Sequence, residues 1–147
     1  MRGKVKRLRR LLAIRRLEED LDRKTLTQAL ASVTEVESAL TRQEAILEDA
    51  GLAARNALAV GDRGEWLMTD AQREVTGWNR ERLKGLLKAR AAVVPPAIEQ
   101  FLNSRRKHEQ IKHLVGNMKH AADIDEGRKE QAATDDWFLS RLMRTLR

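Results

Sequence analysis

Apolar residues recur at alternating intervals of three and four along most of this 147-residue chain, a spacing typical of helices that pack through one face. In the first half the repeat runs from Leu8 to Leu21, takes a five-residue step to Leu26 and continues to Ala57. Such a step predicts a stutter, which alters the supercoil without ending the helix. We expect one helix over about residues 5–58 with these positions facing a partner: Leu8, Leu11, Ile14, Leu17, Leu21, Leu26, Ala29, Val33, Val36, Leu40, Leu47, Ala50, Ala54 and Ala57.

The second half has the same spacing but contains two prolines. Pro95 and Pro96 lack amide hydrogens, and each ring crowds the preceding helical turn. We therefore expect a longer helix over about residues 66–146 that is kinked or broken at Val93-Val94 and restarts at the prolines. Its partner-facing positions are Trp66, Val75, Trp78, Leu83, Leu86, Leu87, Ala97, Phe101, Ile111, Val115, Met118, Ala122, Ala132, Leu139, Met143 and Leu146. Polar residues that could fix the register or mark the end of the partner helix occupy the repeat at Ser104, His108, Asp125, Lys129 and Asp136.

Residues 59–65 separate the two patterns and predict a chain reversal. Gly61 and Gly64 suit a tight turn, and Asp62 can cap the second helix with Glu65 as its capping-box partner. The two glycines also fit a GxxG loop that clamps a nucleic-acid backbone, but that loop requires a β-sheet context that this chain does not offer. The expected fold is all-α, a single elongated antiparallel two-helix coiled-coil hairpin over residues 1–147.

A reversal at this point sets the register between the two arms. The expected neighbours are Leu47 with Val75, Val36 with Leu86, Leu21 with Phe101, and Val5 with Met118. Residues from about 120 onward then lack a partner in the first helix, although they still have an apolar face. An unpartnered apolar stripe predicts a protein-binding site or a frayed end.

The charge distribution supports the hairpin. The net charge is +7, with +8 over residues 1–17, −7 over 18–74 and +7 over 75–122. Folding back at Gly61 brings the acidic stretch from Glu18 to Asp49 beside the basic stretch from Arg80 to Lys107. Complementary flanks of this kind set orientation in coiled coils.

Nothing in the sequence indicates catalysis, a metal or a cofactor. There is no phosphate-binding glycine loop, no cysteine, and no nucleophile with a matching base. His108, His113 and His120 lack the i, i+4 spacing that grips zinc from one helix. The apolar run Leu11-Leu12-Ala13-Ile14 is too short for an export signal, and no stretch is long enough to span a membrane. We expect a non-enzymatic, soluble and cytoplasmic protein.

Two surface features invite binding hypotheses. Eight Lys and Arg residues among the first 16 could neutralise phosphates, but no aromatic side chain is interleaved with them for base stacking, so nucleic-acid binding is the alternative hypothesis. Close to the reversal, four large apolar residues could anchor a protein partner or cap the hairpin's own interface: Trp66, Leu67, Met68 and Trp78.

The chain resembles the FliJ family of flagellar export stalk proteins, which has YscO-type relatives in injectisomes. The resemblance comprises the basic, Leu-rich start (Val5, Leu8, Leu11, Ile14 with Arg15, Arg16, Glu18, Glu19), Ala97-x3-Phe101-x3-Arg105-Arg106, Glu109-Gln110-x3-Leu114, and Arg128-Lys129-Glu130-Gln131 before Asp135-Asp136. Pro95-Pro96 departs from the family's unbroken second helix.

The resemblance implies a two-helix stalk, similar to the γ subunit of rotary ATPases, that works in flagellum biogenesis and motility or in an injectisome. It would act in type III protein export at the cytoplasmic face of the inner membrane, peripheral to it. The implied partners are the hexameric export ATPase, the export gate protein and substrate chaperones. The ATPase-facing residues would be Lys6, Arg7, Arg10, Arg128, Gln131, Asp135, Trp137 and Phe138. The tip residues Trp66, Leu67, Met68 and Trp78 would be a candidate surface for the export gate. Flagellar or injectisome service, and monomer or dimer, stay open.

Overall fold

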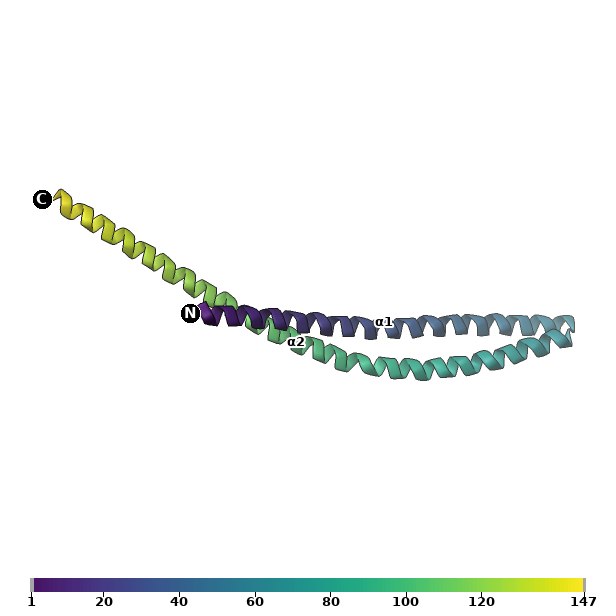
Figure 1. The fold of residues 1–147 in the computed structure, drawn as a ribbon. Helices are drawn as coiled ribbons and strands as arrows, with labels where there is room; N and C mark the ends of the chain where they lie inside the picture. Colours follow the sequence, from purple (N-terminus) through teal and green to yellow (C-terminus); the bar gives the residue numbers. More distant parts are fainter. Residues whose placement is uncertain (1, 147) are drawn as a thin grey trace. The chain divides into compact units, whose positions relative to one another are not determined.

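The computed structural model describes residues 2–146, which form two long helices packed against each other. Helix α1 spans Arg2–Val60 and helix α2 spans Arg63–Thr145, and the described residues contain no strand (Figure 1). The all-α two-helix hairpin expected from the sequence is confirmed. Both helices run further toward the reversal than their apolar patterns indicate, so that Gly61 and Asp62 alone separate them.

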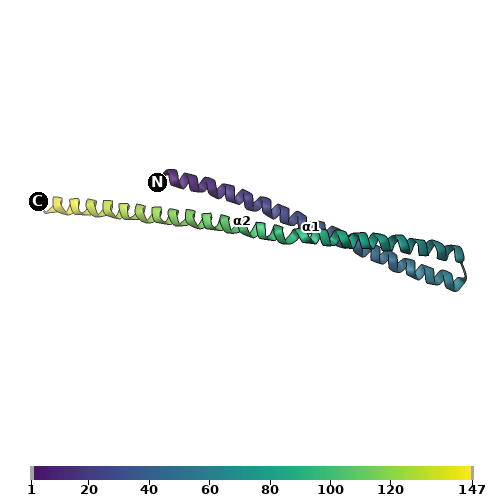
Figure 2. The same ribbon diagram turned by 90° about the horizontal axis from the view of Figure 1, so that it is seen from below.

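The chain reverses between the end of α1 and the start of α2 (Figure 2), and backbone hydrogen bonds close this turn. Gly61 has φ = 81° and its N–H donates to Leu58 O at 3.3 Å, while Asp62 N–H donates to Ala57 O at 3.0 Å. This pair of bonds is the Schellman arrangement that ends many helices. The Asp62 carboxylate then accepts from Glu65 N–H at 3.1 Å and so caps α2, as expected. The reciprocal half of the expected capping box is absent from the described hydrogen bonds, because Asp62 N–H is already bonded to Ala57 O.

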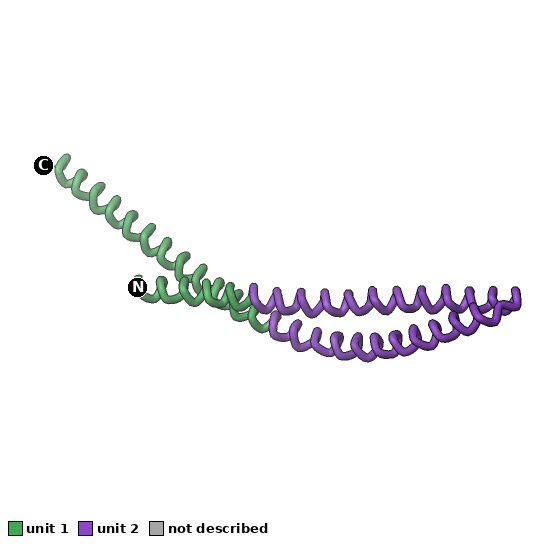
Figure 3. Tube along the Cα trace, turned by 45° about the vertical axis from the view of Figure 1, so that its right-hand side comes forward, with its two compact units in different colours: residues 1–19, 103–147 green, residues 20–102 purple. Residues whose placement is uncertain are grey.

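The chain divides into two compact units (Figure 3). One comprises residues 20–102 and includes the reversal; the other comprises residues 1–19 and 103–147. In the first unit Arg80 Nε lies 3.7 Å from Glu44 Oε1, and Arg90 bonds Ser32. In the second unit Glu19 contacts His108. In each unit, therefore, α1 and α2 run antiparallel.

The contacting face of α1, which we call its seam, follows an unbroken repeat of three and four residues. The buried or half-buried residues on this repeat are Val5, Leu8, Leu12, Arg15, Glu19, Asp22, Leu26, Ala29, Val33, Val36, Leu40, Gln43, Leu47, Ala50, Ala54 and Ala57. The expected stutter is therefore wrong. Six residues beside the repeat are also half-buried, and they include the expected Leu11: Leu11, Glu18, Ser32, Ala39, Gly51 and Ala53. Ile14, Leu17 and Leu21 are 51%, 63% and 64% exposed, since the polar Arg15, Glu19 and Asp22 hold the seam in phase where the apolar residues drift out of it.

The seam of α2 follows the same spacing, and two expected members are wrong. Thr76 is 5% exposed, whereas Val75 and Trp78 face outward and are 50% and 66% exposed. Leu86 is 39% exposed and lies at the edge of the seam, where it lines a cavity with Val36 of α1. The buried or half-buried positions on this repeat are Trp66, Thr69, Thr76, Arg80, Leu83, Leu87, Val94, Ala97, Phe101, Ser104, His108, Ile111, Val115 and Met118, and Gly77 and Asn79 beside it are also half-buried. The expected positions from Ala97 to Met118 are thus confirmed, while Ala122 and all later ones are exposed.

The expected helix break before the prolines is also wrong, because α2 continues through both of them (Figure 2). Without amide hydrogens the prolines leave the carbonyls of Ala91 and Ala92 unbonded within the helix. Both alanines and both prolines are exposed, so water can satisfy these carbonyls. Val94 and Ala97 pack in the seam on either side, which keeps the helix continuous.

Two of the four expected neighbour pairs are confirmed. Val36 and Leu86 line one cavity of about 200 Å³, and Val5 and Met118 line another of about 580 Å³. The pairing of Leu21 with Phe101 is wrong, since Leu21 faces outward and the Arg23 guanidinium lies 5.6 Å from the Phe101 ring centre instead. The pairing of Leu47 with Val75 stays a prediction.

Candidate protein-binding surfaces

The C-terminal extension, which we define as residues 119–146, is the longest exposed segment of the described chain. Met118 is the last half-buried residue of α2, and every residue from Lys119 to Leu146 is exposed. The yellow end of α2 accordingly continues in Figure 1 with no neighbouring helix among the described residues beside it. The start of α1 reaches α2 as far as Ala121, Ala122 and Asp125, which line a groove with Val5. Among the described residues, the turns of α2 beyond Asp125 have no such groove with α1.

The extension is apolar over its last three turns. The exposed large side chains there are Trp137, Phe138, Leu139, Leu142, Met143 and Leu146, and Phe138 and Leu139 are each 60% exposed. Ile124, 44% exposed, lies nearer the start of the extension. Spacings of three and four place Leu139, Leu142, Met143 and Leu146 along one side of the helix. The Arg141 guanidinium lies 5.2 Å from the Trp137 ring centre, and Gln131 Nε2 donates to Asp135 Oδ1 at 3.1 Å. The extension therefore presents aromatic and aliphatic side chains on a regular helix.

The basic start of α1 is the second candidate surface. Its six Lys and Arg residues are all exposed, and the described residues form no ion pair with any of them: Arg2, Lys4, Lys6, Arg7, Arg9 and Arg10. Val5 faces α2 and, with Met118 and Ala122, forms the apolar floor of the 580 Å³ groove, whose rim carries Lys6 and Asp125. This groove combines an apolar floor with basic side chains from α1, so it suits an apolar helix bearing acidic residues.

The predicted ATPase-facing residues are all exposed but do not form one compact site. Lys6 lies at the groove, while Trp137 lies about 15 residues beyond Ala122 on α2, which is roughly 22 Å at about 1.5 Å per residue. Arg128, Gln131 and Asp135 lie between them. Sequence reasoning placed Met118 beside Val5 but missed Arg9 and Ala121 as groove residues, although that pairing was the signal that could have found them.

The predicted tip residues divide between two faces. Trp66 is half-buried and belongs to the seam, where it lines a cavity of about 400 Å³ together with Ala57 and Gly61, and Leu67 lines the same cavity although it is mostly exposed. Leu67, Met68 and Trp78 are 59%, 77% and 66% exposed. The tip is therefore partly a cap on the hairpin's own interface and partly free surface.

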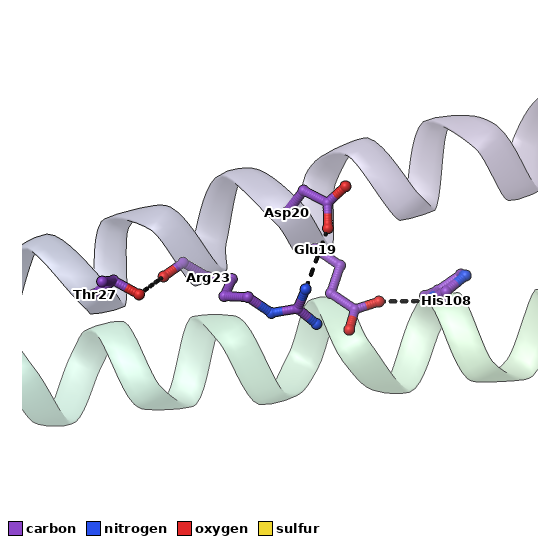
Figure 4. Close-up of polar contacts among 5 residues, drawn as sticks. All are labelled: Glu19, Asp20, Arg23, Thr27 and His108. Carbon is purple, nitrogen blue, oxygen red and sulfur yellow. Dashed lines mark hydrogen bonds and ion pairs between the residues drawn. The ribbon is translucent and has the colours of Figure 1, made fainter.

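Within the second unit, a polar contact lies inside the seam. Glu19 of α1, 6% exposed, and His108 of α2 point toward each other and are hydrogen-bonded (Figure 4). Ser104, one turn before His108, is 8% exposed. A polar layer of this kind disfavours slipped registers, because a slip would leave the buried groups unpaired.

Residues 2–146 include no group of three His, Cys, Asp or Glu side chains placed to hold a metal ion. Neither described helix combines the length and the apolar character needed to cross a membrane. Comparisons with known proteins found no matching family model, no matching curated protein and no matching solved structure.

Proposed function

We propose that this protein is a non-catalytic coiled-coil adaptor of a type III export apparatus, in which the C-terminal extension and the basic start of α1 bind the export ATPase ring. The observation that carries the proposal is the extension itself. It is a helix of about seven turns beyond Met118 whose side chains are all exposed and whose last turns present two aromatic residues.

Apolar side chains exposed to water are unfavourable, and burying them against a partner is favourable. Patches of large apolar side chains on a regular helix mark protein-binding sites, and Trp and Arg are typical anchors of such sites. Trp137 and Arg141 form such a pair in the extension. The basic start of α1 belongs to the same unit and supplies charge for an acidic partner. The resemblance to FliJ-type proteins supports the choice of partner.

The test is ATP hydrolysis by a purified hexameric export ATPase, with binding measured in parallel. We expect the full chain to bind the ring and raise the hydrolysis rate, and the double variant Trp137→Ala/Phe138→Ala to bind about 30-fold more weakly, because two exposed anchors are lost. Leu114→Ala is the matched control, since Leu114 is a 49% exposed residue of the same helix before the extension. No binding by the full chain, or equal loss in the control, would contradict the proposal.

A second candidate function rests on the six exposed and unpaired basic residues at the start of α1. These could bind the phosphates of a nucleic acid, in which case affinity would fall by orders of magnitude between low and physiological salt. Two results together would favour this alternative. The chain would be retained on DNA at physiological salt, and changing Lys6, Arg7 and Arg10 to Gln would abolish this retention. The Trp137→Ala/Phe138→Ala change would have no effect on it.

A further inference from the structure

Helix α2 has a second packing face in the unit formed by residues 20–102, and the seam does not use it. This outer stripe is the repeat of three and four residues that starts at Met68 and passes through Ala71, Val75, Trp78, Arg82, Gly85 and Ala89 to Ala92. All eight residues are exposed, Met68 and Trp78 by 77% and 66%. The opposing α1 shows no such repeat on its outer face, where charged residues such as Glu35, Glu48 and Arg55 are exposed.

Large and small residues are separated along the outer stripe. The half nearer the reversal carries Met68, Val75 and Trp78, whereas the far half carries Gly85, Ala89 and Ala92. Gly85 has no atom of its own chain within 4 Å of where a Cβ would lie. The other helical glycines Gly3, Gly51, Gly77, Gly116 and Gly127 have equally open surroundings, so it is the position of Gly85 on the stripe that matters. Without a Cβ at this position, a large side chain of a partner can approach the helix backbone closely.

Charges flanking the outer stripe are separated in the same way. Glu74 immediately precedes Val75 in the half nearer the reversal, and Lys88 immediately precedes Ala89 in the far half. Both side chains are exposed, and neither is in an ion pair within the described residues. The two halves of the stripe are therefore complementary to each other in both size and charge.

We propose that the outer stripe binds a second copy of this chain, α2 against α2 and antiparallel, about a two-fold axis near residue 80. An antiparallel alignment places Met68 against Ala92 of the second copy and Val75 against its Gly85. Glu74 then lies beside Lys88 of the second copy, and the symmetry repeats each contact. A single surface supplies both the large and the small residues and both charges, which is the condition for a self-complementary interface.

The pairing also explains Trp78. Near the axis it meets Arg82 of the second copy, so a guanidinium can lie over the indole ring. Each copy contributes two helices, and the assembled region is a four-helix arrangement. This inference does not rest on the proposed export function, because it uses none of the residues of the C-terminal extension.

Sedimentation equilibrium over a concentration series tests the dimer. We expect Gly85→Gln to weaken dimerisation at least about tenfold, since a long side chain fills the space that Val75 of the second copy needs. The variant has room to fold, because nothing of its own chain lies near Gly85. Gly116→Gln is the control, as Gly116 is an exposed helical glycine of α2 with the same open surroundings. A wild-type chain that stays monomeric up to about 100 μM, leaving the stripe to some other protein, would overturn the proposal.

Charge reversal tests the orientation. Glu74→Lys and Lys88→Glu should each weaken the dimer about tenfold, because each change places like charges together at both symmetric positions. The double variant Glu74→Lys/Lys88→Glu should restore the dissociation constant to within about threefold of wild type, since the opposite charges meet again. Losses that add in the double variant, with no recovery, would show that the two residues do not face each other.

Discussion

Gly61 is the residue on which the chain reversal depends. Its φ of 81° lies in the left-handed region, and this conformation allows both N–H groups of the Schellman arrangement to reach Ala57 and Leu58. A residue with a Cβ is strained there by about 1–2 kcal/mol. Gly64 sits three residues later in the first turn of α2 and has no such requirement.

Gly61→Ala should therefore lower the free energy of unfolding by about 1–2 kcal/mol. Gly64→Ala, the matched control, should be neutral or slightly stabilising, because its Cβ would lie an ordinary 3.7 Å from Asp62 Oδ1 and alanine favours the helix. Urea unfolding followed by circular dichroism measures both changes. Equal effects at the two glycines would mean that the reversal does not need the left-handed conformation.

The contact between Glu19 and His108 is the other point where single residues matter. Both side chains are removed from water in the seam, with 8% and 18% of their side-chain surfaces exposed. Removing one partner leaves the other desolvated, whereas replacing both with apolar groups removes the penalty.

A double-mutant cycle makes this prediction quantitative. His108→Leu alone should lower the unfolding free energy by about 1–3 kcal/mol because Glu19 is left buried, and the further change Glu19→Leu should recover most of that loss. The readout is denaturant unfolding of the four proteins. If the losses of His108→Leu and Glu19→Leu simply added in the double variant, the pair would not be coupled and its role in fixing the register would be refuted.

Helix α2 is continuous although it contains Pro95 and Pro96. A proline inside a helix is less favourable than alanine by about 3 kcal/mol. Helix α2 absorbs this cost because Val94 and Ala97 remain packed and the affected turn faces water. The prolines also restrict the unfolded chain, which returns about 0.4–1 kcal/mol each.

Replacing both prolines should consequently stabilise the protein. We expect Pro95→Ala/Pro96→Ala to raise the unfolding free energy by at least about 2 kcal/mol, because the replaced residues restore amide donors within a helix that is already continuous. Glu99→Ala, an exposed change one turn further on, is the control and should stay within about 0.5 kcal/mol. A loss of stability in the proline variant would show that the prolines serve the native helix.

The seams show how far an apolar pattern can be followed. From Leu26 to Ala57 and from Ala97 to Met118 the apolar repeat coincides with the buried face, so these positions could be predicted. Ile14, Leu17 and Leu21 are apolar but lie beside the seam and are exposed, whereas the seam residues in this stretch are polar. A local sequence pattern identifies the repeat with the most apolar residues. The residues that contact the other helix are instead those that stay on one continuous repeat along the whole interface, even where some of them are polar.

For the whole molecule, the decisive quantity is how little of the chain is buried. The accessible surface is 12064 Å², whereas a compact monomer of 16.8 kDa would expose about 7,600 Å². The buried apolar residues are Val36, Ala97 and three alanines, which are Ala50, Ala54 and Ala57. Many large apolar side chains therefore stay exposed among the described residues, including those of the C-terminal extension and the outer stripe.

Truncation separates folding from binding at this scale. A variant that ends at Glu126 should keep its unfolding temperature to within about 2 °C, since it retains the groove residues Ala121, Ala122 and Asp125 and the residues removed are all exposed, yet it should fail to bind the export ATPase. Calorimetry and the binding assay are run on the same preparation. A large fall in the unfolding temperature would mean that the C-terminal extension contributes to the fold and is not a free binding surface.

The sequence by itself determined the two helices, their reversal at Gly61 and Asp62, their approximate register and the unpartnered C-terminal extension. These follow from local chemistry and from spacing: glycine permits the left-handed turn, and a sustained repeat of three and four residues makes one face of each helix apolar. Only the tertiary structure decided which of two faces of α2 packs inward. One repeat of α2 contains Val75 and Trp78, and another contains Thr76 and Leu83. Which of them packs against α1 depends on the contacts along the whole interface, and a short stretch of sequence does not show these.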